Sequence, residues 1–333
     1  MKDLLISQIA AYALSLLSPD VVKDPTRTVH LQGDHIGIAV IDFNTKQYKS
    51  VHIIKKKIVH NVTSPIYFDL ASLTKPLTLA STYLTEPQVF EKEDMLLLNH
   101  RGGLPAVFKV EENSDEWRTY VEHLQVKESR VVKYSDTSAV RLMMNLEKKH
   151  IDIHELSHKW LDPEVMYWKD LPEGSTCPTT GKRLNMPIRC VVHDPTAFKI
   201  NSFVTNSGMF GTIDGVAKTL INLNSNNYNL NQVMKSHLPK ATNRFVMGWE
   251  LNKFVDIRPG GVTDEQHVFG HRGYTGTSIW INTKLNIGMV ILTNTSSLEN
   301  GKNANAITSS KHLLRQKLTD YLWKLTKSKF RKI

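Results

Sequence analysis

The sequence predicts an α/β fold of the α+β type: one antiparallel β-sheet flanked by N- and C-terminal helices, with a mostly helical region inserted. Three observations predict it. Runs rich in β-branched residues lie near both ends of the chain, the middle shows the spacing of amphipathic helices, and an amphipathic segment lies at each terminus. The 333 residues suffice for one large domain or two modest ones.

The first sixty residues supply a helix and a hairpin. Residues 1–18 carry apolar side chains at positions 5, 6, 9, 13, 16 and 17, which suits one face of a packed helix. Residues 35–43 are predicted to form a buried strand and residues 48–54 a second strand, with a turn over residues 44–46.

Helices and loops follow in the middle of the chain. We expect a helix from about Ser72 to Leu84, two more over residues 134–149 and 152–161, and a fourth over residues 214–223. Repeated prolines between residues 162 and 200 predict an extended, loop-rich crossing.

The last hundred residues return to strands. Residues 277–282 and 287–293 are β-rich runs joined by a hairpin turn, and residues 308–327 are predicted to form a closing amphipathic helix. We therefore expect an active site at the junction of two regions: an α/β sheet region (residues 1–60 and 250–333) and a mostly helical region (residues 61–249).

The composition is that of an ordinary globular protein, with 41% hydrophobic and 22% charged residues and a formal net charge of +10. Lys and Arg are spread along the chain without zinc-finger spacing or an aromatic–basic strand motif. A solvated basic surface is therefore favoured over specific nucleic-acid binding. No stretch reaches the roughly 20 apolar residues that would make a transmembrane segment, and the oligomeric state is left open.

Cys177 and Cys190 are too few for a disulfide framework, and the sequence leaves open whether they pair. The cellular compartment is judged from the N-terminus. Asp3, Ser7 and Gln8 interrupt the apolar N-terminal run, and no small-x-small cleavage site follows it. These features favour a packed helix in a cytoplasmic protein over a cleaved signal in an exported or periplasmic one.

A candidate nucleophile lies in Ser72-Leu-Thr-Lys75, the one Ser-x-x-Lys in the chain. Residues three apart share a helix face, so the Lys75 amine can reach the Ser72 hydroxyl. Serine needs an adjacent base, and lysine serves if burial or a neighbouring cation lowers its pKa. The competing interpretation is a surface lysine on an ordinary helix. Pro76 fits a helix start, where the Ser72 N–H remains available to an oxyanion.

Two further segments carry candidate polar groups. In Lys133-Tyr-Ser-Asp-Thr137, Tyr134 could pass a proton and Asp136 could bind Lys75, or both could simply cap the following helix. In Val268-Phe-Gly-His-Arg-Gly-Tyr-Thr-Gly276, three glycines allow close backbone approach to a ligand and His271 is titratable, although an ordinary glycine-rich turn would look the same.

Taken in order, these motifs resemble the serine β-lactamase and penicillin-binding protein superfamily, in its class C β-lactamase and esterase branch. Tyr134-Ser-Asp136 is similar to the Tyr-x-Asn motif of that branch, and His271-Arg-Gly273 to its His-x-Gly motif. Other similar segments are Leu97–Pro105, Val192–Ala197, Ser207–Asp214, Met247–Trp249 and Val290–Asn294. The resemblance runs from about residue 35 to residue 300 and implies a β-lactamase/transpeptidase-like fold.

The resemblance also implies roles. Ser72 is the expected acylated nucleophile, Lys75 the general base and Tyr134 the proton relay. Backbone N–H groups of Ser72 and Tyr274 are expected to form the oxyanion hole, and His271 to orient the substrate or support Tyr134. Neither a cofactor nor a metal is implied, and the implied partner is a small-molecule or peptidoglycan-derived substrate. His100, His193 and Asp194 lie in the similar segments and are expected to be structural.

Three departures from the family pattern matter. Asp136 replaces the usual Asn; an ionised carboxylate cannot donate to a substrate carbonyl, and it favours the charged form of Lys75. Arg272, beside Gly273, replaces the usual Thr and adds a fixed charge suited to a substrate carboxylate. The connection over residues 82–94 is short, which predicts a more open site.

The sequence thus predicts an SxxK serine hydrolase that acts through a Ser72 acyl-enzyme on an ester or a D-alanyl-type amide, as esterases and DD-peptidases do. These substrates rank above β-lactams because of Asp136. The alternative is a catalytically silent binding protein that retains the penicillin-binding fold.

Overall fold

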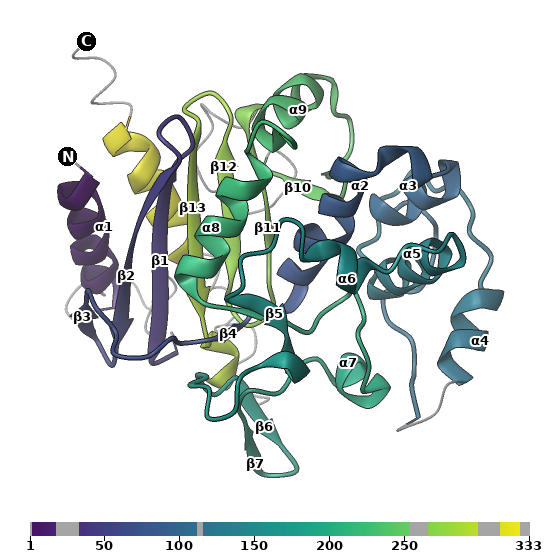
Figure 1. Ribbon diagram of the computed structural model, residues 1–333, viewed down its shortest axis with the longest axis horizontal. Helices are drawn as coiled ribbons and strands as arrows, with labels where there is room; N and C mark the ends of the chain where they lie inside the picture. The colour runs from purple at the N-terminus through teal and green to yellow at the C-terminus, as the bar shows by residue number, and fades with distance from the viewer. Residues whose placement is uncertain (1, 18–32, 112–115, 253–265, 299–313, 327–333) are drawn as a thin grey trace.

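An eight-stranded antiparallel sheet crosses the molecule (Figure 1). A computed structural model describes residues 2–17, 33–111, 116–252, 266–298 and 314–326 of the chain. The strands follow the order β3-β2-β1-β13-β12-β11-β10-β9. Their bounds are β1 His35–Asp42, β2 Gln47–Ile54, β3 Lys57–Val59, β9 Phe245–Val246, β10 Trp249–Leu251, β11 Val268–Arg272, β12 Ser278–Asn282 and β13 Ile287–Thr293.

The two ends of the chain meet in the middle of this sheet. β1 pairs antiparallel with β13, so that Ile38 lies opposite Ile291. β1 and β2 form the predicted N-terminal hairpin, and β12 and β13 form the predicted C-terminal one. The predicted fold class, a large antiparallel sheet with flanking helices, is confirmed.

The two terminal helices cover one face of the sheet (Figure 1). They are α1 (Lys2–Leu16) and a C-terminal helix over residues 314–326. Ile9 of α1 and Leu318 of the C-terminal helix are fully buried against strand residues such as Ile38. The apolar face predicted for the first helix is therefore a core face, as its spacing indicated. The start of the predicted closing helix, residues 308–313, lies outside the described residues.

The opposite face is covered by α8 (Ile213–Leu223), which lies across β1, β2 and β13. Alternate residues of β1 divide between the two faces: Ala39 and Ile41 pack under α8, whereas Ile36 and Ile38 face the terminal helices. This alternation is the period-two pattern of a strand buried on both sides.

The inserted region holds the remaining described α-helices, most of which lie on the side of the sheet where β11, β10 and β9 stand (Figure 1). They are α2 Ser81–Thr85, α3 Lys92–Leu98, α4 Glu116–His123, α5 Asp136–Lys148, α6 Ile153–Ser157, α7 Pro195–Ile200 and α9 Leu230–His237. A small sheet links this region to the large one, in the order β4 (Phe68–Asp69), β8 (Met209–Gly211) and β5 (Val165–Tyr167). None of the helices in the described ranges is long and apolar enough to span a bilayer.

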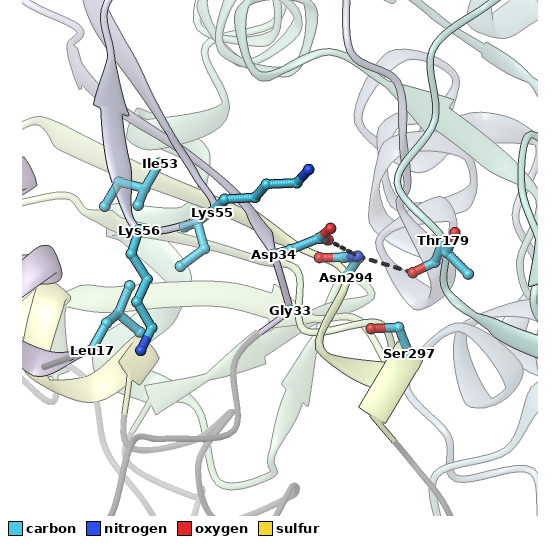
Figure 2. Close-up of a pocket in the computed structure, with 10 residues that line it drawn as sticks. Leu17, Gly33, Asp34, Ile53, Lys55, Lys56, Thr179, Asn294 and Ser297 are labelled. Carbon is cyan, nitrogen blue, oxygen red and sulfur yellow. Dashed lines mark hydrogen bonds between the residues drawn. The ribbon is translucent and has the colours of Figure 1, made fainter. Parts of the chain in front are cut away.

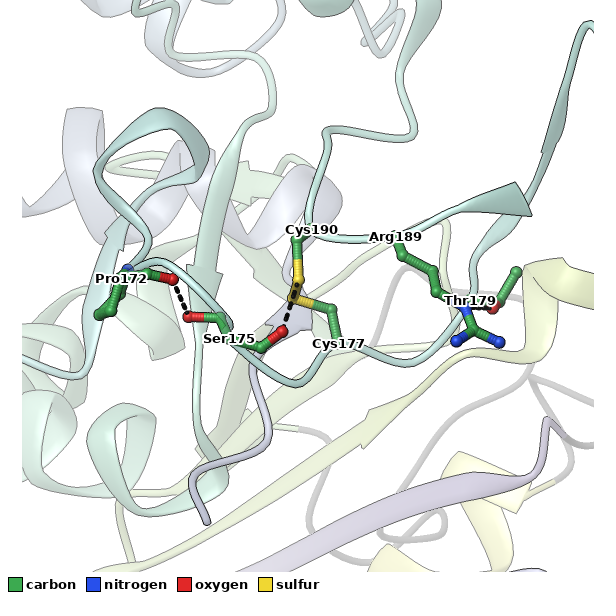
Figure 3. The surroundings of a disulfide bond; sticks show 6 residues. All are labelled: Pro172, Ser175, Cys177, Thr179, Arg189 and Cys190. Atoms are coloured by element: carbon green, nitrogen blue, oxygen red, sulfur yellow. Dashed lines mark hydrogen bonds between the residues drawn. A yellow bond between two sulfur atoms is a disulfide. The ribbon is translucent and has the colours of Figure 1, made fainter. Parts of the chain in front are cut away.

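The crossing over residues 162–200 contains more structure than its prolines predict. Besides β5 and α7 it forms a hairpin of β6 (Gly181–Arg183) and β7 (Met186–Ile188). A disulfide between Cys177 and Cys190, with Cα atoms 5.3 Å apart, closes the base of this hairpin (Figure 3). The pairing that the sequence left open is therefore present, and it stabilises a segment that has little core of its own.

Candidate active site

Ser72 lies on a short 3-10 turn, η3 (Ala71–Leu73), directly after β4. Ala71 adopts a left-handed backbone with φ 49°, which is unfavourable for a residue with a Cβ. The buried Asp69 carboxylate stabilises this turn by accepting the N–H groups of Ala71 at 2.8 Å and His193 at 2.7 Å. A strained turn held by a buried acid thus presents the partly exposed Ser72.

The helix predicted from Ser72 is present but irregular. After η3 it continues as a π-helical segment, η4 (Pro76–Ala80), and ends as α2. Pro76 has no N–H to donate, and a hydroxyl group just after the segment takes up its carbonyl: Ser81 Oγ donates to Pro76 O at 2.9 Å. Such π segments occur often at functional sites.

Lys75 is buried, and three oxygens surround its Nζ. Nζ lies 3.2 Å from Ser72 Oγ, 2.8 Å from the Asn206 carbonyl oxygen and 2.6 Å from Asp136 Oδ1. It also lies 4.9 Å from the centre of the Tyr134 ring. The structure therefore brings the predicted nucleophile, lysine, tyrosine and aspartate together around one ammonium group.

Burial alone would lower the pKa of Lys75, but the Asp136 carboxylate and the Tyr134 oxygen outweigh it and hold this pKa above the ordinary value. The ammonium form therefore prevails at neutral pH. It donates to Ser72 Oγ and does not accept from it, so the resting serine keeps its own proton. Lys75 in this state orients the serine and supplies positive charge.

Tyr134 stands over this group, in an aromatic cage. Its ring centre is 4.6 Å from that of His100, 5.9 Å from that of Phe245 and 6.0 Å from that of His271. Burial raises the pKa of the phenol, although Lys75 and Ser72 act in the opposite direction, so the phenol is protonated at neutral pH. His100 was expected to be structural. Its Nδ1 accepts the backbone N–H of Ser135, the residue after Tyr134, so His100 helps to fix the position of Tyr134.

His271 is buried and neutral. Its Nδ1–H donates to the Arg272 carbonyl at 3.0 Å, and burial lowers its pKa to about 3. Nε2 is then an acceptor, and it is buried without a hydrogen bond from any described residue. Tyr134 Oη, Asn206 Oδ1 and Ser207 Oγ share this condition. Of these, Tyr134 Oη and His271 Nε2 belong to rings that lie 6.0 Å apart, so both can take up a hydrogen bond from a ligand or water at the site.

The glycine-rich turn after β11 is bound to the segment that precedes the nucleophile. Thr275 Oγ1 donates to Asp69 O at 2.7 Å and Thr277 Oγ1 to Leu70 O at 3.1 Å. A Cβ on Gly273 would lie 2.6 Å from Leu70 O, so only glycine fits there. These contacts hold the turn that carries Tyr274 against the segment that leads into Ser72.

Arg315 of the C-terminal helix supports this turn from behind. Its guanidinium is buried and donates to the carbonyls of Gly273, at 2.5 Å, and Thr277, at 2.8 Å, and its Nε to Gly276 O at 3.3 Å. Burial lowers its pKa to about 9, and the repulsion of Arg272 adds to the shift. A charged residue is held here because three carbonyls need donors.

Arg272 is placed differently from the sequence-based expectation. It was expected to offer its charge to a substrate carboxylate. Its guanidinium instead forms a bidentate pair with the buried Glu250, at 2.9 and 2.8 Å, and Arg244 binds the same carboxylate. Two cations on one carboxylate leave a net charge of +1 at this edge of the site, and they lower the pKa of Glu250 to about 2 despite its burial.

Sequence reasoning did not identify Asn206, Glu250 or Arg315 as parts of this site. Asn206 and Glu250 carry no motif signal, since their contacts come from distant elements. Arg315 does carry one, because it is a charge on the apolar face of an amphipathic helix, between Leu314 and Leu318.

Two surface hollows lie away from these residues. Figure 2 shows the first, of about 510 Å³, whose lining includes Ile53, Lys55 and Lys56. Its Asn294 donates to Asp34 and to the Thr179 carbonyl, which ties neighbouring segments together. The second, of about 560 Å³, lies between β2 and α8. In the described part of the chain, no three His, Cys, Asp or Glu side chains are placed to hold a metal ion.

Comparison with known proteins identifies the family and finds similar folds. The Beta-lactamase family model matches residues 71–310. The fold is similar to that of a beta-lactamase from Mycobacterium bovis, with 17% identity, TM-score 0.53 and coverage of 94% of this chain and 99% of that one. It is also similar to that of a beta-lactamase from Sulfitobacter sp. EE-36, with 13% identity, TM-score 0.57 and coverage of 94% of this chain and 98% of that one. A class C beta lactamase from Rhodobacter sphaeroides has a similar fold, with 13% identity, TM-score 0.55 and coverage of 92% of this chain and 98% of that one. No curated protein sequence matches the chain.

Proposed function

The chain belongs to the beta-lactamase family, and on that premise we propose that it is a serine hydrolase that forms an acyl-enzyme on Ser72, with esters as its preferred substrates. The observation that carries this proposal is the cluster of Ser72, Lys75, Tyr134 and Asp136, with Nζ of Lys75 3.2 Å from Ser72 Oγ and 2.6 Å from Asp136 Oδ1.

The protonation states suggest how the reaction runs. As Ser72 Oγ attacks the ester carbonyl carbon, Tyr134 passes its phenolic proton to the ester alkoxy oxygen and takes the Ser72 proton in the same concerted step. The alkoxy group then leaves as an alcohol when the tetrahedral intermediate collapses, so the phenol is neutral before and after the step. The Lys75 ammonium stabilises negative charge that develops on the phenolic oxygen meanwhile, and the N–H groups of Ser72 and Tyr274 stabilise the oxyanion. Water then releases the acid by the same relay in reverse.

Asp136 is the reason for proposing esters ahead of amides and β-lactams. An amide nitrogen has to be protonated before its C–N bond breaks, which asks for a stronger acid–base pair than an alkoxide does. Because Asp136 holds Lys75 in its charged form, the lysine is poorly suited to act as the base in that harder reaction. A D-alanyl ester and a D-alanyl peptide differ in the bond that is cleaved, so comparing their rates of hydrolysis separates ester from amide preference.

One observation favours a second candidate. A lysine that is locked as an ammonium by a carboxylate also suits a protein that binds such substrates without turning them over. In that case substrate would bind at the site and no acid would be released.

The test is a hydrolysis panel with a D-alanyl ester, a D-alanyl-D-alanine peptide and a chromogenic cephalosporin. We expect turnover of the ester above the other two, and a loss of about 10⁶-fold in turnover for Ser72→Ala. Ser236→Ala, an exposed serine on α9, is the matched control and should keep the wild-type rate. Binding without turnover would favour the silent protein, and equal rates for Ser72→Ala and wild type would exclude Ser72 as nucleophile.

A further inference from the structure

The β6–β7 hairpin projects from the body of the molecule (Figure 1). Arg183 pairs with Met186, so Leu184 and Asn185 form a two-residue loop at its tip. The Cys177–Cys190 disulfide holds the base of the hairpin (Figure 3). The tip is therefore presented on a short, covalently closed stalk.

The tip carries apolar side chains into solvent. Leu184 is 93% exposed and Met186 is 69% exposed. Leu184 and Asn185 also have positive φ, 49° and 66°, as a type I′ turn requires. Asn tolerates this conformation and Leu does so poorly, so a folding requirement alone would favour Asn or Gly at position 184. Leu184 thus has an unfavourable backbone conformation and also exposes an apolar side chain to water.

The flanks of the tip are basic. Lys182 and Arg189 are exposed, and no Asp or Glu occurs between residues 174 and 193. Arg183 is engaged within the protein, because its guanidinium donates to the carbonyls of Val192 and His193. The hairpin therefore combines an apolar tip with uncompensated positive charge, in a chain of net charge +10.

We propose that this hairpin docks the protein on an anionic phospholipid surface. Leu184 and Met186 enter the boundary between headgroups and acyl chains, and Lys182 and Arg189 lie at the level of the phosphates. A soluble acidic polymer would complement the lysine and the arginine but would offer no apolar environment to Leu184 and Met186. Lipid is therefore the partner that accounts for both features.

The same segment leads from the hairpin into the candidate active site. The His193 backbone N–H donates to Asp69, and the His193 ring stacks on the exposed Tyr274 with ring centres 5.4 Å apart. Docking through the hairpin would therefore hold the site close to the lipid surface. This docking does not depend on the proposed hydrolysis, since it involves none of the residues around Lys75.

The experiment is vesicle flotation of the full chain, with vesicles of phosphatidylglycerol and phosphatidylcholine in equal parts against phosphatidylcholine alone. We expect binding to the anionic vesicles only. The double variant Leu184→Asn, Met186→Asn should bind about tenfold or more weakly, and Lys182→Gln about fivefold more weakly. Leu184→Asn should also leave the melting temperature unchanged or raise it. If Leu184 served only to stabilise the fold, the same substitution would lower the melting temperature.

Matched controls lie elsewhere on the surface. Tyr120→Asn removes an exposed apolar side chain from α4, and Lys235→Gln removes an exposed charge from α9; both should bind as wild type does. Absence of binding to anionic vesicles would overturn the proposal. So would undiminished binding of the double variant, or equal weakening by Lys235→Gln, since either outcome indicates adsorption through overall charge alone. Polyphosphate that displaces the wild type and the double variant from anionic vesicles equally well would indicate a site for an acidic polymer instead, and would also overturn the proposal.

Discussion

Lys75 and Asp136 are the two residues on which the protonation chemistry of the site depends. Their atoms lie 2.6 Å apart, and the carboxylate is the group that raises the pKa of the lysine against the effect of burial. With an amide in place of Asp136, burial would dominate and the lysine would lose its proton at lower pH.

Asp136→Asn is therefore predicted to move the basic limb of the pH profile of ester hydrolysis to lower pH, because the Lys75 ammonium that the ester reaction uses then loses its proton at lower pH. It should also raise the rate on amides or β-lactams relative to esters. Profiles of kcat/KM against pH for wild type, Asp136→Asn and the charge-conserving Asp136→Glu would check this. A basic limb that stays in place in the Asn variant would show that Asp136 does not control the lysine.

Glu250 is the second residue whose charge state matters, here for stability. Its folded pKa, about 2, lies below the ordinary 4.5, so it stabilises the fold above about pH 4.5 and this contribution is lost as the pH falls towards 2. Glu250→Gln should lower the free energy of unfolding by about 3 kcal/mol at pH 7, because two arginines lose their carboxylate. Urea unfolding at a series of pH values should show the difference from wild type shrinking below about pH 4.5. A constant difference across that range would contradict the ion-pair explanation.

At the scale of elements, the site is assembled where η3, α5 and β11 meet, and the turn after β11 depends on the C-terminal helix. Arg315→Met is predicted to lower kcat by at least tenfold with little change in KM, because the turn that carries Tyr274, the proposed oxyanion donor, loses three hydrogen bonds to its carbonyls. Lys324→Met, an exposed position on the same helix, is the control. Steady-state kinetics with an ester substrate measure kcat and KM for both variants. Equal kcat values for the two variants would contradict the prediction, because the turn would then keep its shape without Arg315.

The elements also show what the sequence can predict. The strands of both hairpins, α5 and α8 follow from local apolar spacing, which needs no knowledge of distant residues. The π segment after Ser72 and the β6–β7 hairpin did not follow, because hydroxyl-to-carbonyl bonds and a disulfide override the local pattern there. Ser72, Lys75 and Tyr134 were predicted from their motifs, and the structure places them close together. The pairing of Arg272 with Glu250 was not, because it joins neighbouring strands whose register no local signal reports.

At the scale of the whole molecule, the disulfide bears on both stability and compartment. It closes a loop with a sequence separation of 13. Replacing both cysteines with serine is predicted to cost about 3 kcal/mol of unfolding free energy. Denaturant unfolding with and without reductant checks this: reductant should destabilise the wild type and leave the double variant unchanged. A wild type that is insensitive to reductant would contradict the prediction.

We propose from the same disulfide that the protein works in an oxidising compartment, which favours the exported alternative over a cytoplasmic location. Helix α1 would be retained there, since Ile6, Ile9 and Ala13 are part of the core and their removal would uncover one face of the sheet. Thiol alkylation of the native protein followed by mass analysis tests this; two alkylated cysteines in the freshly isolated protein would point to a reducing compartment.

The central claim, that Ser72 is the acylated nucleophile, has one direct test. The protein is incubated with a fluorophosphonate and, separately, with a fluorescent penicillin, then digested, and the modified peptide is sequenced by mass spectrometry. The account predicts a fluorophosphonate adduct on Ser72, its absence in Ser72→Ala, and much slower labelling in Lys75→Ala. An adduct on another serine, or no adduct with either probe in a protein that hydrolyses no ester, would contradict it.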